Sequence, residues 1–407
     1  MKKRCLNYTV VKSLITFLLL VHFLSASTFV KAKVQLPSIL SSNMVLQQHT
    51  NVKLWGKAQK NSPITIKTSW DNKTYKTIAD KQGKWLLNIS TPVAGGPYEI
   101  TFNDGELLTL KNILIGEVWF CSGQSNMEMP MSGFDRQPTQ GTNDVIAKAK
   151  ASTPIRIYNT DSKDGKWIRQ FSKTPEEDCK GEWLENTPVN VSHTSATAYF
   201  FAQYLQEVLE VPVGIIISSL GGSKVEAWMS REAITPFKSI DLSILNNNEP
   251  IKNITATPCV LYNSKIAPFT NFTIKGFLWY QGESNRDNVD LYKDLMPVFV
   301  KDIRNKWNIG EFPFYFVEIA PFNYEGANGT SAARMREVQQ QNMKDIPNSG
   351  MVTTLGIPSL STRQIKKLLV AVWLFGPLPK PMGKKDSAMP LPFTNLWKYQ
   401  EIKYTLI

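Results

Sequence analysis

Two spacings of hydrophobic and polar positions divide this chain into a shorter first part and a longer second part. From about residue 33 to residue 110, short apolar runs alternate with Gly, Asn and Asp residues of the kind found in turns. These runs are VKLWGKA, SPITIKTSW, KTYKTIAD, GKWLLNIS, GGPYEITFND and LLTLKNI. Short β-type runs at such close spacing predict a small antiparallel β domain, arranged as a sandwich.

After about residue 111 the apolar runs are separated by longer segments with helical periodicity. Short, β-rich runs alternate with helix-like stretches, which predicts an α/β domain with a mainly parallel sheet. The strand-like runs cover residues 112–120, 153–159, 211–219, 274–281, 312–320 and 350–355, and the helix-like stretches cover 195–209, 289–307 and 331–343.

Polar turns that contain glycine follow three of the predicted strands. They read SGQSN, LGGSKVEAW and QGESN. Active sites of parallel sheets lie at the carboxyl ends of the strands, so we expect these turns to share one edge. Ser125 would then be a candidate nucleophile. Gly221 and Gly222 could aim backbone N–H groups at an oxyanion, and Gln281 or Asn285 could supply a side-chain donor.

Each of these turns also has a simpler structural interpretation. A serine after a strand commonly caps a helix, GGS commonly forms a turn, and QGESN could begin a helix with Glu283 near its dipole. Ser125 does not lie in a GxSxG elbow, because Met127 occupies the position of the second glycine. The common α/β-hydrolase arrangement is therefore disfavoured. The catalytic interpretation depends on the three turns lying together.

The charge of the chain is concentrated at its two ends. The net charge is +12 over 407 residues, of which residues 1–32 carry +5 and residues 356–407 carry +6. The body between them is nearly neutral and gives no electrostatic reason to expect a nucleic-acid partner.

The first 32 residues have the pattern of a secretory signal peptide. A basic start precedes the apolar run LITFLLLVHFL, and VKA at 30–32 offers small residues for cleavage. An uncleaved membrane anchor is the alternative, although this run is short for a membrane span. We therefore expect a periplasmic or extracellular protein with no stable membrane span after cleavage.

The cysteines do not indicate a disulfide scaffold or a metal centre. Beyond the first segment the chain has Cys121, Cys179 and Cys259, which are widely scattered and form no CxxC pair. Their number and scatter do not suggest a disulfide scaffold, and the lack of a CxxC pair gives no indication of zinc. We expect no metal and no other cofactor.

Three motifs together resemble the sialate O-acetylesterase family, a branch of the SGNH-type serine esterases that act on carbohydrates. They are GQSNMEMP, SSLGGSKVEAWM and WYQGESN, in this order, and LPSILSSNMVLQQ at 36–48 resembles the start of the family. The similarity covers roughly residues 33 to 355. It implies a three-layer SGNH-hydrolase-like domain over 111–355, preceded by the small β-sandwich domain over 33–110. It also implies a sialate 9-O-acetylesterase-like activity that removes acetyl groups from sugars or sialic acid without a metal.

The resemblance also assigns roles to residues. Ser125 matches the family nucleophile, and Gly222 and the QGESN turn match the region of the oxyanion hole. The candidate residues for the oxyanion hole or for substrate binding are Gln124, Gly221, Gly222, Gln281, Glu283 and Asn285.

The histidine that this chemistry requires is missing from its expected place. The acid and histidine of the family lie in a late loop, roughly D-I-G-D-P-x-x-I-H-P, after the strand that matches GMVTTL. A serine hydroxyl needs such a base to take its proton. The chain has only three histidines. His22 lies in the signal peptide, His49 belongs to the small β domain, and the resemblance places no catalytic residue at His193. Glu283 is the alternative, as a poor substitute base.

The tail 356–407 does not resemble the family, but the neighbouring reading frame does. Synonymous codons permit D-I-G-D-P, two residues and then I-H-P from Thr353 onward, followed later by W-A-L-A-K-T-Y-G-K-K. The boundary between Met382 and Gly383 must encode glycine in that frame. We hypothesise that a frameshift near Thr353 replaced the acid–histidine loop and everything after it. As written, the chain is then a very weak esterase or none.

Two other functions remain open from the sequence. A non-catalytic carbohydrate-binding protein would use the same cleft, and the aromatic residues of EVWF, EAWM and LWYQ would suit sugar stacking, although core packing is their simpler role. Within the enzyme class, a xylan acetylesterase is the nearest alternative.

Overall fold

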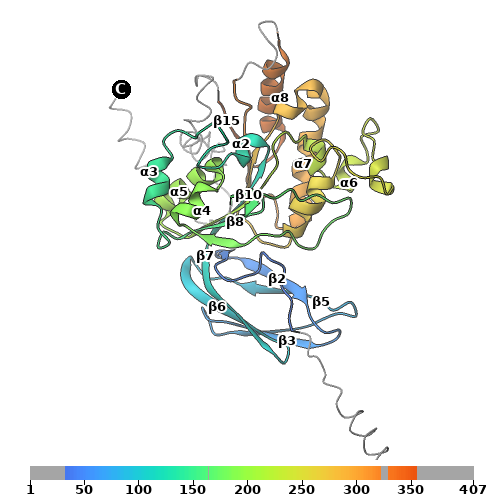
Figure 1. Ribbon diagram of the computed structural model, residues 1–407. Coiled ribbons are helices and arrows are strands. Elements are labelled where there is room, and N and C mark those ends of the chain that lie inside the picture. Colours follow the sequence, from blue (N-terminus) through green and yellow to red (C-terminus); the bar gives the residue numbers. More distant parts are fainter. Residues whose placement is uncertain (1–32, 164, 322–328, 355–407) are drawn as a thin grey trace, which may run out of the picture.

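The computed structural model describes residues 33–163, 165–321 and 329–354. The predicted signal peptide 1–32 and the predicted aberrant tail 356–407 lie outside these residues. The described residues form a small all-β part next to a larger body of helices and strands (Figure 1).

The small part consists of two facing β-sheets. Alternate residues of β3 point inward, so that Ile64 and Ile66 are fully buried, as expected for strands with one face on a core. Trp85 and Phe102 come from different sheets, and their ring centroids lie 5.9 Å apart. The antiparallel β domain predicted from the sequence is therefore present. One sheet pairs β2 (Asn51–Lys57) with β5 (Lys84–Ser90), and the other contains β1 (Val45–Gln47), β3 (Pro63–Thr68), β4 (Thr74–Ile78), β6 (Gly95–Asn103) and the start of β7.

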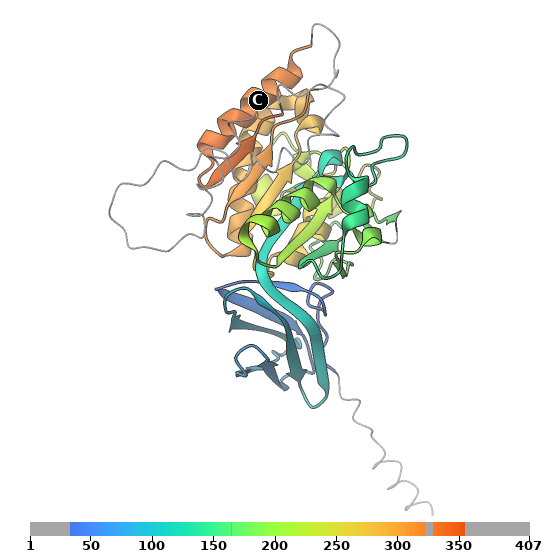
Figure 2. The same ribbon diagram turned by 90° about the vertical axis from the view of Figure 1, so that its left-hand side faces the viewer.

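One long strand, β7 (Leu107–Gly123), runs from the small part into the centre of the larger body (Figure 2). Its first residues pair with β6, and from Glu117 onward it pairs with β12. The boundary predicted at residue 110 therefore falls inside a continuous strand. Because the backbone of a strand is extended and hydrogen bonded on both sides, this connection is not a flexible linker.

The larger body is built on a mainly parallel sheet, as the sequence predicts. Its strand order is β11-β8-β12-β7-β13-β14-β15, and only the edge pair β11–β8 is antiparallel. The strands are β8 (Ile155–Asn159), β11 (Trp183–Glu185), β12 (Val213–Ser219), β13 (Gly276–Tyr280), β14 (Phe314–Val317) and β15 (Ser349–Val352).

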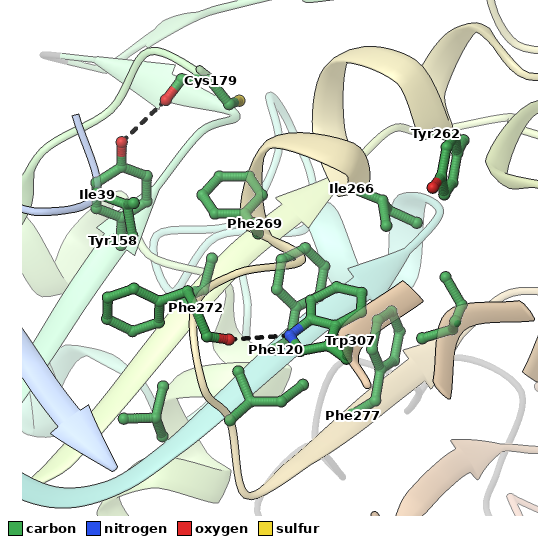
Figure 3. Close-up of a cluster of buried hydrophobic side chains, with 14 of the residues drawn as sticks. Ile39, Phe120, Tyr158, Cys179, Tyr262, Ile266, Phe269, Phe272, Phe277 and Trp307 are labelled. Carbon is green, nitrogen blue, oxygen red and sulfur yellow. Dashed lines mark hydrogen bonds between the residues drawn. The ribbon is translucent and has the colours of Figure 1, made fainter. Parts of the chain in front are cut away.

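Helices cover both faces of this sheet, which gives the three layers expected. Trp119 on one face of β7 packs against Phe201 of α5 (Ala196–Leu209), with ring centroids 4.9 Å apart. Phe120, on the opposite face, packs against Trp307 of α7 (Val289–Trp307) (Figure 3). Successive strand residues point to opposite faces, so this one strand contributes to both cores.

Local sequence explains where the long helices begin and end. The side chain of Asn288 accepts a hydrogen bond from the N–H of Leu291 and caps the start of α7. Asn308 ends the same helix in the left-handed conformation. The remaining elements are α2 (Ser125–Glu128), α3 (Asn143–Lys148), β9 (Ser162–Lys163), β10 (Lys166–Trp167), α4 (Pro188–Ser192), η1 (Val225–Trp228), α6 (Arg231–Ile234), η2 (Ser243–Asn246), η3 (Tyr262–Ile266), η4 (Ala267–Phe269), η5 (Glu283–Asn288) and α8 (Ser331–Asp345).

Candidate active site

The three polar turns leave the sheet at the same level of one edge. In the strand register, Gly123 at the end of β7 lies opposite Ser219 at the end of β12. On its other side, Gly123 lies opposite Tyr280 at the end of β13. The expectation that the turns share one edge is therefore confirmed.

Ser125 is held at this edge by a tight connection. Gly123 has a φ of 143°, and a side chain there would collide with the backbone of Tyr280. The N–H of Gln124 then donates to the Tyr280 carbonyl over 2.9 Å. Ser125 follows as the first residue of α2 and is half-buried. No residue within 33–163, 165–321 or 329–354 hydrogen bonds to the hydroxyl of Ser125. With respect to the described residues, this hydroxyl is therefore available to a substrate.

In the turn after β12, three consecutive backbone N–H groups are already hydrogen bonded. An N–H that is satisfied inside the protein does not stabilise a substrate oxyanion. The N–H of Ser219 donates to the Asp161 carboxylate over 2.9 Å, that of Leu220 to the Gly123 carbonyl over 3.0 Å, and that of Gly221 to Oε2 of Glu128 over 2.7 Å.

This arrangement separates the roles of the two glycines. The N–H of Gly221 is taken, which corrects the expectation that Gly221 is an oxyanion donor. A Cβ at Gly221 would lie 2.6 Å from Oε2 of Glu128 and 3.6 Å from Cβ of Ser125, so its contribution is close approach to the serine. Gly222 has a φ of 74°, and its N–H has no acceptor in the described part of the chain. It is the available backbone donor of this turn.

The side chains of Gln281 and Asn285 do not face an open site. Gln281 is fully buried and donates both N–H bonds of its amide, to the carbonyl of Ser223 and to Oδ1 of Asn285. Asn285 is 1% exposed and donates to Glu226 over 2.8 Å. The expectation that these amides are oxyanion donors is thereby corrected, because they hold the turns to each other.

Gln124 and Glu283 keep free atoms at the site. Oε1 of Gln124 accepts the N–H groups of Gly282 and Ser284 over 3.2 and 3.3 Å, while its amide nitrogen has no acceptor among the described residues. Oε1 of Glu283 accepts from the amide of Asn126 over 2.8 Å. Its Oε2 is buried without a partner, and burial raises the pKa of this carboxyl.

A pocket of about 850 Å³ opens beside these residues. Gly222 and Glu283 line it, as do the basic side chains of Lys224, Arg286 and Arg334. The pocket therefore contains the free backbone donor of the turn beside basic groups, of which Lys224 pairs with Asp287 over 2.6 Å and Arg334 with Asp290 over 2.9 Å. Its other lining residues are Asn253, Thr255, Ala256, Ser284, Asp287 and Ser331.

Neither described histidine lies at Ser125. His49 is exposed in the turn between β1 and β2 of the small part. His193 is exposed at the end of α4, where its ring lies next to Gly165. A histidine base for Ser125 is therefore not supplied by the described residues. The predicted replacement of the family loop near Thr353 concerns positions outside them.

The structure adds a buried charge network that the sequence reasoning did not identify. Glu128 accepts from Arg169 and from Gly221, and it is 6% exposed. Burial and the nearby charge of Asp161 raise the pKa of Glu128, whereas Arg169 opposes this increase. Asp161 pairs with Lys265 over 2.9 Å in the interior. Glu128 follows Ser125 by three positions, so helical spacing was a usable signal, whereas Asp161 and Lys265 are far apart in sequence.

The tryptophans of the three motifs belong to the core. Trp119 is 4% exposed, and Trp228 and Trp279 are fully buried, which excludes sugar stacking on these rings. The exposed ring near the network is Trp167, with Arg169 above it at 5.1 Å from the ring centroid.

Within residues 33–163, 165–321 and 329–354, no group of three or more His, Cys, Asp or Glu residues is arranged to hold a metal ion. No helix there has both the length and the apolar character needed to cross a membrane. Cys121, Cys179 and Cys259 are free thiols in the interior.

Comparison with known proteins matches most of the chain. The family model described as carbohydrate esterase, sialic acid-specific acetylesterase, matches residues 115–364, which is more than half of the chain. The chain belongs to this family of carbohydrate esterases. The family segment contains Ser125 and both other turns of the site.

Individual relatives of this esterase family agree with the match. The sialate O-acetylesterase of Mus musculus is 26% identical over 364 residues, which cover 78% of this chain and 66% of the relative. The sialate O-acetylesterase of Homo sapiens is 26% identical over 342 residues, which cover 78% of this chain and 63% of the relative. The chain thus spans just under two thirds of the length of these relatives. A carbohydrate acetylesterase from Xanthomonas citri has a similar structure, with a TM-score of 0.72 and 28% identity, covering 84% of this chain and 76% of the other.

Proposed function

We propose that this site is built for a serine O-acetylesterase that acts on acetylated sugars, with Ser125 as the nucleophile. The observation that carries the proposal is the turn beside Ser125, in which Gly222 is the N–H donor left without an acceptor among the described residues. Membership of the sialic acid-specific acetylesterase family supports the same reaction class.

The proposed reaction follows acyl transfer through a covalent intermediate. Oγ of Ser125 attacks the carbonyl carbon of the acetyl ester, and a base takes the hydroxyl proton. The carbonyl oxygen becomes an oxyanion that accepts from the Gly222 N–H and from the amide of Gln124. The C–O bond to the sugar breaks, and the sugar oxygen receives the proton. Water then attacks the acetyl-serine, which releases acetate and restores Ser125.

The base is the incomplete part of this site. No histidine follows His193 in the chain. Glu283 is the candidate base, because it accepts a hydrogen bond from Asn126, the residue that follows Ser125. Its buried carboxyl has a raised pKa, which suits proton transfer. We expect it to be a poor substitute. We also propose that the family loop is encoded in the neighbouring frame from Thr353 onward, and resequencing the gene across the codons for residues 345–365 tests this.

The pocket beside Gly222 favours an acidic sugar over a neutral one. Its basic lining residues Lys224, Arg286 and Arg334 outnumber the acidic ones, Glu283 and Asp287, by three to two. Lys224 pairs with Asp287 and Arg334 with Asp290, and both pairs are exposed enough for a substrate carboxylate to compete. A carboxylate such as that of sialic acid gains from this charge, and a xylan chain does not. We therefore favour a 9-O-acetyl sialic acid type of substrate over acetylated xylan. The signal-like segment 1–32 supports secretion to the periplasm or beyond.

One observation favours a second function from another class. Because the described residues provide no histidine at Ser125, the cleft could bind acetylated sugars without cleaving them. Acetate release from O-acetyl sialic acid separates the two functions. Release by the chain, and its loss in Ser125→Ala, supports the esterase. Sugar binding without acetate release, even after the neighbouring frame is restored, supports the binding protein, and full activity of Ser125→Ala overturns the assignment of Ser125.

A further inference from the structure

The turn that carries Gly222 is held by carboxylates on two sides. Asp161 accepts from both the N–H and the hydroxyl of Ser219, at the start of the turn. Glu128 accepts from the N–H of Gly221, directly before Gly222. These bonds come from different elements, and they add to the bonds of Leu220 with Gly123 and of Ser223 with Gln281.

Glu128 also lies on the same short helix as the nucleophile. Ser125 and Glu128 are three positions apart on α2, which places them on one face. A side chain added at Gly221 would touch both residues. Through this single carboxylate, the helix that carries Ser125 is tied to the turn that carries the free N–H.

We propose that Glu128 is the positioning residue that sets the oxyanion turn against Ser125, and that it does so only as a carboxylate paired with Arg169. The inference rests on the proposed esterase function for its kinetic consequence, but the fixed turn is a property of the fold. Glu128 does not act on the substrate, because both of its oxygens are engaged by Arg169 and Gly221.

The charges around Glu128 determine when it is ionised. Burial raises its pKa most, and the Asp161 carboxylate raises it further, although Lys265 pairs with Asp161. Arg169 and the Gly221 N–H act in the opposite direction. As the pH falls through this raised pKa, Glu128 takes up a proton and loses its ion pair with Arg169. The bond to Gly221 weakens at the same time, since a neutral carboxyl is a poorer acceptor.

The kinetic test uses the full chain and its Ser125-dependent hydrolysis of 4-nitrophenyl acetate, measured from acidic to neutral pH. Glu128→Gln keeps the shape of the side chain but removes the charge. We expect it to lower kcat at neutral pH by at least about ten-fold, with KM little changed, because a displaced oxyanion donor acts on the transition state. This variant should lose the part of the acidic limb that Glu128 causes, while protonation of the base still lowers the rate at acidic pH. Glu128→Asp keeps the carboxylate, so it should retain more activity than Glu128→Gln and should keep the acidic limb of the pH profile.

Arg169→Met should shift the pH profile of hydrolysis in a direction that a purely structural role of Glu128 does not predict. Without the arginine the pKa of Glu128 rises further, so the acidic limb should move to higher pH. Glu232→Gln is the matched control, because it removes one carboxylate that pairs with Lys306 in a solvent-exposed position. It should leave kcat and the pH profile unchanged.

Hydrogen exchange of the peptide 218–224 tests the turn without any catalysis. After correction for the intrinsic effect of pH, the wild type should lose protection at the Gly221 amide on acidification, and Glu128→Gln should have the lower protection there at every pH. The amides of Ser219 and Leu220 are bonded to Asp161 and Gly123, and should keep their protection. If Ser125→Ala hydrolyses 4-nitrophenyl acetate as fast as the wild type, the proposed esterase function is wrong. In that case the hydrogen exchange result alone decides whether Glu128 fixes the turn. Unchanged kcat in Glu128→Gln, an unmoved limb in Arg169→Met, or protection that does not depend on pH would overturn it.

Discussion

The N–H of Gly221 donates to the Glu128 carboxylate over 2.7 Å, and this bond decides which glycine of the LGGS turn is available to a substrate. Gly221 packs against the serine, while Gly222 keeps its N–H free among the described residues. Two adjacent glycines that are equivalent in sequence thus have different roles, and this difference can be tested.

Gly222→Ala should lower both stability and activity. Gly222 has a φ of 74°, a conformation that costs an alanine on the order of 1 kcal/mol in the free energy of unfolding. Gly310 is the matched control, because it has a φ of 86° and open space around it, far from the site in the loop before β14. We expect the same loss of stability in Gly310→Ala, and a loss of acetate release only in Gly222→Ala. Alanine keeps the N–H but disfavours this backbone conformation, so equal activity of the two variants would contradict the expectation that the position of the Gly222 N–H limits the reaction.

Ser125→Ala should abolish hydrolysis in a frame-restored protein. Loss of a serine nucleophile costs on the order of 10⁶-fold in kcat, and a residue of activity remains from the oxyanion hole and binding. The chain as written should be far slower than the frame-restored protein, since it lacks the family histidine and has Glu283 as a poor substitute base. Ser132→Ala, at an exposed serine outside the site, is the control. Acetate release from O-acetyl sialic acid is measured for the frame-restored protein, for its Ser125→Ala and Ser132→Ala variants and for the chain as written.

Lys265→Met should destabilise the fold strongly. Lys265 and Asp161 are 1% and 3% exposed, and removal of one partner leaves a charge buried without compensation. Such a loss costs about 3–5 kcal/mol in the free energy of unfolding. Lys306→Met is the control, because its partner Glu232 is largely exposed, and this pair is worth about 0–1 kcal/mol. Urea unfolding of both variants checks the contrast, which fails if their losses are equal.

Glu177→Gln should show a small effect that depends on pH. Lys57 and Lys84 lower the pKa of Glu177 to about 2, and these lysines belong to the small β part. Because the folded pKa is depressed, the stabilisation is present above the ordinary value of 4.5 and is lost as the pH falls toward 2. All three side chains are more than half exposed, so we expect less than about 1 kcal/mol at neutral pH.

The measurement for Glu177 is thermal unfolding of the wild type and the variant from neutral to acidic pH. Their difference should shrink as the pH falls and should decrease at high salt, because exposed ion pairs are screened. A difference that grows on acidification would contradict the assigned sign.

The sequence by itself determined the elements and the edge on which the site is built. Periodicity placed α7 at residues 289–307, and the apolar runs placed β7, β12 and β13 in the sheet. Because parallel strands end at one edge, the spacing of the three turns was enough to bring Ser125 next to the other two turns. The motifs were also enough to indicate the esterase family.

Only the tertiary structure decided which polar groups at that edge are free. The availability of a donor depends on its partners, and these partners are far away in sequence, as Asp161 is from Ser219 and Gln281 is from Ser223. Periodicity reports whether a residue is buried, but it does not report what a buried amide bonds to. For this reason the sequence could not distinguish Gly221 from Gly222, could not exclude Gln281 and Asn285, and did not reveal Glu128 as the residue that joins the nucleophile to its turn.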